Sequence, residues 1–164
     1  MYDEGTYRRV LDLDTAMVKV KYYANKVEYV REYFASNFDQ VLALKISGNK
    51  PAHLNFTIYL DNKYIYHSYV NNKNQIIMDG SCPRLEIYGN DNPQGIQFLA
   101  VLDLQISDGA GAVCVLDGRK LRVEGCNSAI ILLAASSLFD APFTQPVDSN
   151  RDPKSSSLSI MDLV

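Results

Sequence analysis

Strict alternation of apolar and polar side chains is the feature that most constrains how this chain can fold. Residues 52–60 show it most clearly, since every second side chain there is apolar. The apolar set is Ala52, Leu54, Phe56, Ile58 and Leu60, and the set between them is His53, Asn55, Thr57 and Tyr59. Successive side chains of a β-strand point to opposite faces, so this period predicts a strand with one face on a core and the other in solvent.

The same period recurs along most of the chain, and helical spacing is nearly absent. The pairs Asn25-Lys26 and Asp117-Gly118 each separate two such runs, which predicts tight β-hairpin turns. The predicted strands cover residues 15–24, 27–36, 39–47, 52–60, 64–70, 75–78, 96–106, 112–116 and 120–124.

Two stretches need a separate interpretation. Residues 129–135 are apolar without alternation, which fits either a short buried helix or a central strand covered on both faces, and the β-branched Ile130 and Ile131 favour the strand. In residues 39–47 we expect Leu42, Leu44 and Ile46 to face the core. Together the patterns predict an all-β fold, an antiparallel β-sandwich of about ten short strands.

The composition shifts to Pro, Asp, Ser and Lys after residue 143. We therefore assign residues 1–143 to the sandwich domain and residues 144–164 to a linker or tail. A short helix beginning at Pro153 would place Leu158 and Met161 on its apolar side. We expect the chain to end before that helix buries anything.

Composition and charge exclude several classes of function. The chain has 16 basic and 19 acidic side chains, a net charge of -3, and its basic residues are scattered, so we expect no nucleic-acid partner. No apolar run reaches the ~20 residues that cross a bilayer, so we expect no membrane partner. The cysteines Cys82, Cys114 and Cys126 lack paired short spacing, which leaves free thiols, the favoured interpretation, or one Cys114–Cys126 bridge.

No residue pattern identifies a catalytic centre, a cofactor site or a metal site, so we assign none. Asp12 and Asp14 would share one face of an extended segment, as a general acid and base could, but the favoured interpretation is that they accept backbone hydrogen bonds at a turn. His53 and His67 have no Cys or carboxylate at ligand spacing.

Tyr64 and Tyr66 are the candidate sugar-contact residues, because exposed aromatic rings stack on sugar faces while their hydroxyls bond to sugar hydroxyls. Alternation places Tyr69 and His67 on the opposite face. The competing and favoured interpretation is that these rings cover a sheet edge or a domain interface. Separately, Asn55 begins the N-glycosylation sequence Asn-Phe-Thr and is expected to face outward.

Several stretches, in collinear order, carry a family resemblance. They are residues 7–16 (YRRVLDLDTA), 31–36 (REYFAS) with 39–41 (DQV), and 132–137 (LLAASS). They resemble glycoside hydrolase family 95, the α-L-fucosidases. Residues 90–98 (NDNPQGIQF), which lead into 101–109 (VLDLQISDG), resemble its plant members in particular.

In that family an N-terminal β-sandwich precedes a linker and an (α/α)6 barrel that carries the chemistry. The resemblance implies that this chain is a truncated part of that sandwich, incomplete at its N-terminal side, whose partner in the full-length parent is the barrel. It implies hydrolysis of α-1,2-linked L-fucose with inversion by the parent. No family catalytic residue can be carried over to this sequence, so we expect the chain alone to be inactive.

Three functions therefore stay open. The leading one is an accessory, structural domain of an α-L-fucosidase. The second is a stand-alone carbohydrate-binding module that contacts a fucosylated cell-wall glycan through Tyr64 and Tyr66, and the third is a non-functional fragment of a gene model. Localisation also stays open, because the family is secreted to the apoplast whereas residues 1–20 lack the apolar core of a secretory signal.

Overall fold

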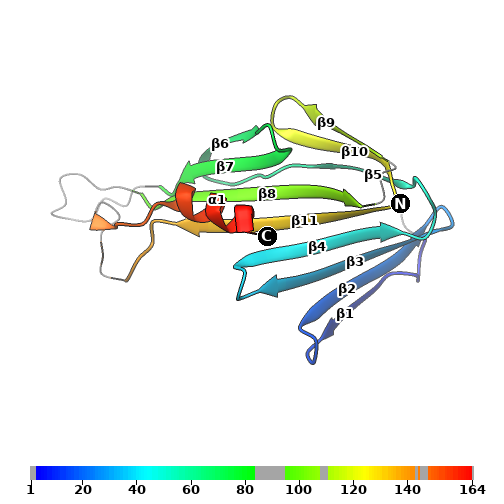
Figure 1. Ribbon diagram of the computed structural model, residues 1–164. Coiled ribbons are helices and arrows are strands. Elements are labelled where there is room, and N and C mark those ends of the chain that lie inside the picture. The colour runs from blue at the N-terminus through cyan, green and yellow to red at the C-terminus, as the bar shows by residue number, and fades with distance from the viewer. Residues whose placement is uncertain (1–2, 84–94, 108–110, 143, 145–147, 164) are drawn as a thin grey trace.

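A computed structural model describes residues 3–83, 95–107, 111–142, 144 and 148–163, and the fold within them is dominated by antiparallel β-sheet (Figure 1). The strands are β1 (Arg8–Asp12), β2 (Met17–Ala24), β3 (Val27–Ser36), β4 (Val41–Gly48), β5 (Leu54–Ile58), β6 (Ile65–Val70), β7 (Gln75–Ser81), β8 (Gln97–Ser107), β9 (Ala112–Leu116), β10 (Lys120–Cys126) and β11 (Ser128–Ser137). The helix α1 (Pro153–Leu163) follows them. The predicted all-β sandwich is confirmed.

The strands form two sheets. The large sheet has eight strands in the order β1-β2-β3-β4-β11-β8-β7-β6, and the small sheet has three in the order β5-β10-β9. Strand β11 returns to the middle of the large sheet, where it pairs antiparallel with both β4 and β8. The central position explains why residues 129–135 lack alternation, and the predicted central strand is confirmed.

Two predicted hairpin turns are present between the expected strands. Asn25 and Lys26 have φ angles of 52° and 60°, and Asp117 and Gly118 have φ angles of 52° and 66°. Positive φ at both central residues is the geometry of a type I′ turn, whose twist matches that of the paired strands it joins. The turns therefore join β2 to β3 and β9 to β10 in antiparallel pairs.

The first hydrophobic core lies between the two sheets. Its buried residues are Leu54, Ile76, Leu102, Leu104, Leu121, Val123, Cys126, Ala129 and Ile131. The inward face predicted for residues 52–60 is largely confirmed, since Leu54 is buried and Phe56 and Ile58 pack against this cluster, although Ala52 is exposed.

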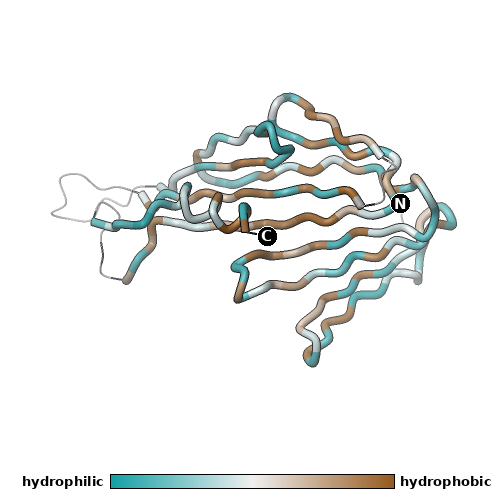
Figure 2. Tube along the Cα trace, viewed as in Figure 1, coloured by the Kyte–Doolittle hydropathy of each residue, from teal (hydrophilic) through white to brown (hydrophobic). Residues whose placement is uncertain are grey.

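The second core lies on the opposite face of the large sheet, beneath α1. Its buried residues are Val41, Ala43, Ile77, Leu99, Val101, Leu132, Ala134 and Met161. Strands β8 and β11 contribute to both cores, and they appear mostly brown in Figure 2. A strand covered on both faces has no polar side to present, which accounts for the composition of β11 and of residues 99–102 in β8, whereas Gln105 of β8 is exposed.

The expectation that the C-terminal helix buries nothing is wrong. Met161 and Ser157 of α1 are buried, and Leu158 packs against the second core. The Ser157 hydroxyl donates to the backbone oxygen of Leu99 at 3.2 Å and is hydrogen-bonded to the hydroxyl of Ser136. The short helix is buried because the sheet below it already presents an apolar second face.

Other differences from the sequence expectations are local. Leu42 is 44% exposed, although Leu44 on the same face packs against the first core. Cys114 is exposed and Cys126 is buried, and both are free thiols, so the alternative of a bridge between them is wrong. No helix among the described residues is long and apolar enough to cross a membrane.

The small sheet covers only part of the large one. Its residues pack against β7, β8 and β11, whereas β1, β2 and β3 extend away from it (Figure 1). Strand β5 lies at one edge of the small sheet, because its ladder partner in the described residues is β10 alone. The apolar side of β1–β3 that faces this edge is therefore only partly covered.

Candidate functional site

The predicted sugar-contact residues do not form one platform with the other aromatic residues of β6. Tyr64 precedes β6 and is 48% exposed. The Tyr66 hydroxyl donates to Asp61 Oδ1 at 2.8 Å, and this bond to a carboxylate raises the pKa of Tyr66. The Tyr69 ring lies tilted against His67, with the ring centres 5.3 Å apart, and it packs against the second core. Sugar contact by Tyr64 and Tyr66 stays a prediction.

The turn interpretation of Asp12 is confirmed. Its Oδ1 accepts hydrogen bonds from the backbone nitrogens of Asp14 at 3.0 Å and Thr15 at 3.4 Å. A hydrogen bond from the Thr15 side chain, followed by those two backbone bonds, lowers the pKa of Asp12. The Asp12 carboxylate therefore organises the turn between β1 and β2.

Asn55 is exposed on β5, as the sequence predicted. Its Oδ1 accepts a hydrogen bond from the backbone nitrogen of Gly125 at 3.0 Å, across the small sheet. Glycosylation at Asn55 stays a prediction. The two histidines lie apart from each other: His53 Nδ1 is 2.7 Å from the backbone oxygen of Pro51, and His67 Nδ1 is 3.5 Å from Asp79 Oδ1.

No three His, Cys, Asp or Glu side chains gather around one point within the described ranges. The hollow beside His67 and Asp79, about 600 Å³, lies between the β6–β8 end of the large sheet and the start of α1. It is lined by Tyr66 as well, but the ring of Tyr64 is not part of it. The predicted aromatic residues therefore do not converge on this hollow.

Another candidate surface lies on the partly covered face of β1–β3, where two hollows adjoin. The first, about 500 Å³, is lined by Tyr7, Tyr22, Ala24, Tyr29, Arg31, Ile46, His53, Leu54, Asn55 and Phe56. The second, about 390 Å³, is lined by Tyr7, Arg9, Val18, Val20, Tyr22, Arg31 and Tyr33. Because Tyr7, Tyr22 and Arg31 line both, we treat the two hollows as one surface, the Tyr–Arg trough.

Arg31 is the central charged group of the Tyr–Arg trough. Its Nη2 donates to the Tyr22 hydroxyl oxygen at 3.1 Å, and its guanidinium lies 5.5 Å from the centre of the Tyr22 ring. The Tyr22 ring in turn stacks on Tyr29 at 5.4 Å. The Arg31 Nε atom is buried, and the described residues offer it no hydrogen-bond partner.

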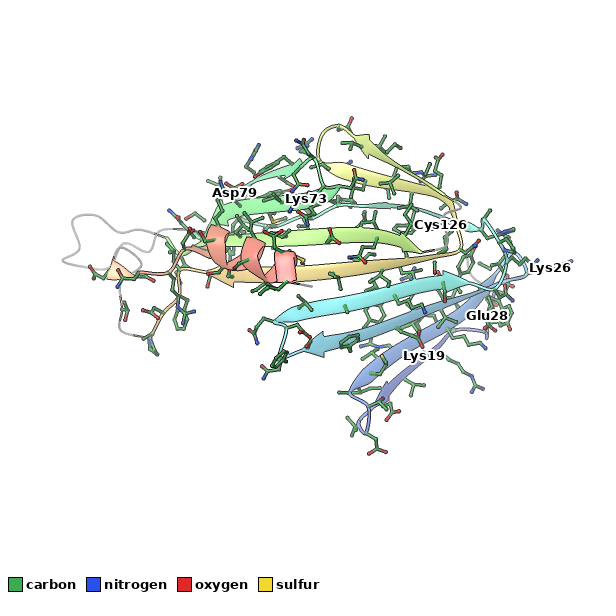
Figure 3. The ribbon with its side chains drawn as sticks, in the orientation of Figure 1. Lys19, Lys26, Glu28, Lys73, Asp79 and Cys126 are labelled. Carbon is green, nitrogen blue, oxygen red and sulfur yellow. The ribbon has the colours of Figure 1, made fainter. Side chains whose placement is uncertain are left out.

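Charge is distributed unequally between the two faces of β2 and β3. On the face opposite the trough, Lys19 pairs with Glu32 at 2.9 Å and Lys21 pairs with Glu28 at 2.7 Å. Figure 3 labels Lys19 and Glu28 on these strands. The described residues that line the trough include two arginines but neither Asp nor Glu. The trough is therefore positive and lacks a negative partner.

On the face opposite the trough, the Glu28 carboxylate should make the stability of the fold depend on pH. Hydrogen bonds from Lys21 and then from the Tyr23 hydroxyl hold the pKa of Glu28 below its ordinary value of 4.5. A lowered folded-state pKa adds stability above the unfolded value, and this contribution is lost as the pH falls through the folded value. Wild type should therefore exceed Glu28→Gln in free energy of unfolding at pH 7, and this excess should be smaller at pH 3, below the ordinary value of 4.5. Urea unfolding at both pH values measures this, and an unchanged difference would contradict it.

Residues 2–142 match the model of a known protein family, which is described as the glycosyl hydrolase family 65 N-terminal domain. That match spans more than half of the chain. The chain belongs to this family. The motifs resembled family 95, whereas the matching model carries the number 65, and in both cases the matching part is the N-terminal domain of a glycoside hydrolase.

A related protein of known name also supports the resemblance of this glycosyl hydrolase N-terminal domain to the α-L-fucosidases. The chain is 45% identical over 165 aligned positions to "Alpha-L-fucosidase 2" of Arabidopsis thaliana. The alignment covers 93% of this chain but 20% of the relative. The recognition of a plant-type α-L-fucosidase N-terminal domain is confirmed, and the chain spans about a fifth of that relative's length.

The Tyr–Arg trough of this N-terminal domain was missed by sequence reasoning. Its residues come from β1 to β5 and from the positions just before β1 and β5, and they meet only after the strands pair in their register. One signal was available: Arg31 occupies the same alternating face of β3 as Val27 and Tyr29. A charge on an otherwise apolar face of a strand marks a position that needs a specific partner.

Proposed function

We propose that this chain is an accessory, structural domain of an α-L-fucosidase and that the residues which hydrolyse fucose lie outside these 164 residues. The observation that carries the proposal is the partly covered sandwich, in which an apolar, positively charged trough remains open on β1–β3. A sheet with an apolar face is stable only when another layer covers that face. The fraction of the relative that this chain matches, 20%, leaves ample polypeptide for such a layer.

The parent activity that the resemblance implies is removal of α-1,2-linked L-fucose from glycans. The domain would pack against the catalytic region and support its entrance, without contributing an acid or a base. Geometry supports this role, because of the two neighbouring carboxylates in residues 12–14 the Asp12 group accepts backbone hydrogen bonds within a turn, one of them from the Asp14 nitrogen. Paired carboxylates for glycoside hydrolysis must instead flank a sugar from opposite sides.

An activity assay tests the proposal directly. The purified chain, incubated with an α-1,2-fucosylated oligosaccharide, should release no more fucose than a buffer blank. A mock purification from cells that lack the gene controls for contaminating fucosidase. Release of fucose by the chain above the mock preparation would refute the accessory role.

A stand-alone carbohydrate-binding module is the second candidate function. The observation that favours it is exposure: Tyr64 is 48% exposed, whereas the Tyr59 ring, 56% exposed, has the Lys120 ammonium 5.4 Å from its centre. Retention of the chain on an immobilised fucosylated oligosaccharide, abolished by Tyr64→Ala or Tyr66→Ala, would support this function. We expect no retention, because the Tyr66 hydroxyl already bonds to Asp61.

A further inference from the structure

We propose that Asn55 is an N-glycosylation site whose amide has two roles: the oxygen holds a β-bulge of the small sheet, and the nitrogen carries the glycan. The inference goes beyond the proposed function and does not depend on it. The chemistry is a group transfer from a lipid-linked oligosaccharide diphosphate. The Asn55 nitrogen forms a bond to C1 of an N-acetylglucosamine, the diphosphate leaves that carbon with the bonding electron pair, and the amide gives up one proton.

The first observation is the sequence around Asn55. The acceptor for N-glycosylation is an asparagine followed by any residue except proline and then by serine or threonine, and Asn55-Phe56-Thr57 meets this requirement. Every other asparagine of the chain lacks serine or threonine two positions later. Any N-linked glycan on this chain should therefore be attached at a single position.

The second observation is the orientation of Asn55 and Thr57 on β5. Both side chains are exposed, whereas Leu54 between the turn and Asn55 is buried and Phe56 packs against the first core. Alternate side chains of a strand point to opposite faces, so Asn55 and Thr57 share the outer face of the small sheet. A glycan attached there extends into solvent without displacing a side chain of the core.

The third observation is the β-bulge beside Asn55. The ladder between β5 and β10 shifts its register between Val123 and Cys126. As a result, Glu124 and Gly125 together lie opposite Asn55, and a bulge of this kind leaves a backbone group without a partner in the ladder. The Gly125 nitrogen donates to Asn55 Oδ1 at 3.0 Å, so the side chain supplies the missing acceptor. Gly125 has a φ angle of 67° and brings no side chain to this contact.

The contact with Gly125 fixes which way the Asn55 amide points. A backbone nitrogen only donates, so the atom that faces Gly125 is the oxygen, and Nδ2 lies on the other side of the amide. Nδ2 is 3.5 Å from the backbone oxygen of His53, near the outer limit of a hydrogen bond. Glycosylation replaces one of the two hydrogens on Nδ2 and leaves the oxygen unchanged. The glycan and the bond to Gly125 are therefore compatible.

The β-bulge by itself does not require asparagine at position 55. Aspartate offers Gly125 the same acceptor, and a charged acceptor binds an N–H more strongly. The Thr57 hydroxyl accepts a hydrogen bond from Arg122 at 3.3 Å, but Arg122 also bonds to Glu124, so its guanidinium has another partner. What the bulge leaves unexplained is asparagine followed two positions later by threonine, and glycosylation explains that pair.

Secretion of the full chain tests the inference. The chain is produced behind a cleavable secretory leader in a eukaryotic host, whose lipid-linked oligosaccharide is the donor. Wild type should show one shift to higher mass on a gel. A peptide-N-glycosidase should remove this shift and convert the modified asparagine to aspartate, which the mass of the peptide around position 55 identifies.

Substitutions locate the glycan. Asn55→Asp and Thr57→Val should each lose the shift completely, because each destroys the acceptor sequence, whereas Thr57→Ser should keep it. Asn72→Asp is the matched control, since Asn72 is also exposed but lies outside an acceptor sequence, and it should keep the full shift. Gels of cell lysate and medium are compared for every variant, so that a variant which is not secreted is still scored for glycan.

Hydrogen exchange tests whether the folded sheet keeps the bond to Gly125 when the glycan is present. The Gly125 amide should exchange equally slowly in the glycosylated chain and in unmodified wild type, because Asn55 Oδ1 accepts from it in both. Asn55→Ala removes the acceptor and should exchange faster at Gly125. Urea unfolding of Asn55→Ala confirms that the variant is folded before the exchange rates are compared.

Three outcomes would overturn the inference. Wild type without a mass shift restricts Asn55 to the bulge. A shift that survives in both Asn55→Asp and Thr57→Val places the carbohydrate on another residue. Exchange at Gly125 that is as fast in the glycosylated chain as in Asn55→Ala shows that the glycan breaks the contact, so that the amide does not serve both roles. None of these results changes the outcome of the fucose-release assay, which tests the accessory role separately.

Discussion

Replacing Leu121 with alanine is expected to lower the free energy of unfolding by about 2–5 kcal/mol, the range for a large aliphatic side chain removed from a close-packed core. Leu121 has 0% exposure and lies in the cluster that joins the two sheets. Loss of the Leu121 side chain leaves a cavity between β10 and the large-sheet strands β7, β8 and β11. The small sheet is held to the large sheet mainly through this cluster, so few other contacts compensate. Urea unfolding followed by circular dichroism measures the change.

Leu13→Ala is the matched control for Leu121→Ala. Leu13 lies in the turn between β1 and β2 and is 83% exposed, so the same atoms are removed without a cavity. The control should change the free energy of unfolding by less than about 0.5 kcal/mol. Equal effects of the two substitutions would mean that the interface between the sheets does not stabilise the fold.

The fold was largely predictable because its local signals agree with its global arrangement. Alternation in β5 depends on one face of that strand being covered, and the pairs Asn25-Lys26 and Asp117-Gly118 adopt the turn that their residue types favour. The partition into two sheets was not predictable. Strand β5 pairs with β10, whose residue Val123 lies opposite Phe56, and no local signal specifies a partner so distant in sequence.

The candidate site was much less predictable than the fold. Sequence reasoning selected Tyr64 and Tyr66 for their residue type, yet the aromatic residues of that strand divide between its two faces. The Tyr–Arg trough depends on the register that sets Tyr22 opposite Tyr29 and Val20 opposite Arg31. Register follows from turn geometry and core packing across several strands, so a single strand read by itself cannot reveal it.

Helix α1 shows why a tail can be misinterpreted from sequence. Its eleven residues have a weak apolar pattern, in which Ser157 occupies the most buried position. A small residue lets the helix approach β8 and β11 closely, and the hydroxyl of Ser157 then satisfies the backbone oxygen of Leu99. A serine can be buried when its hydroxyl is hydrogen-bonded. A search for apolar periodicity counts serine as polar and therefore does not predict this burial.

Met161→Ala is therefore expected to destabilise the fold by about 2 kcal/mol, the lower end of the range for a buried methionine, because Met161 retains 8% exposure near the end of α1. The loss should appear in urea unfolding and in faster amide hydrogen exchange along α1, since the helix is held to the sheet by this side chain, Leu158 and Ser157. Leu163→Ala is the control, because Leu163 is 87% exposed in the same helix and its truncation removes little packing. If both variants unfold like wild type, α1 is a detachable tail and the second core does not depend on it.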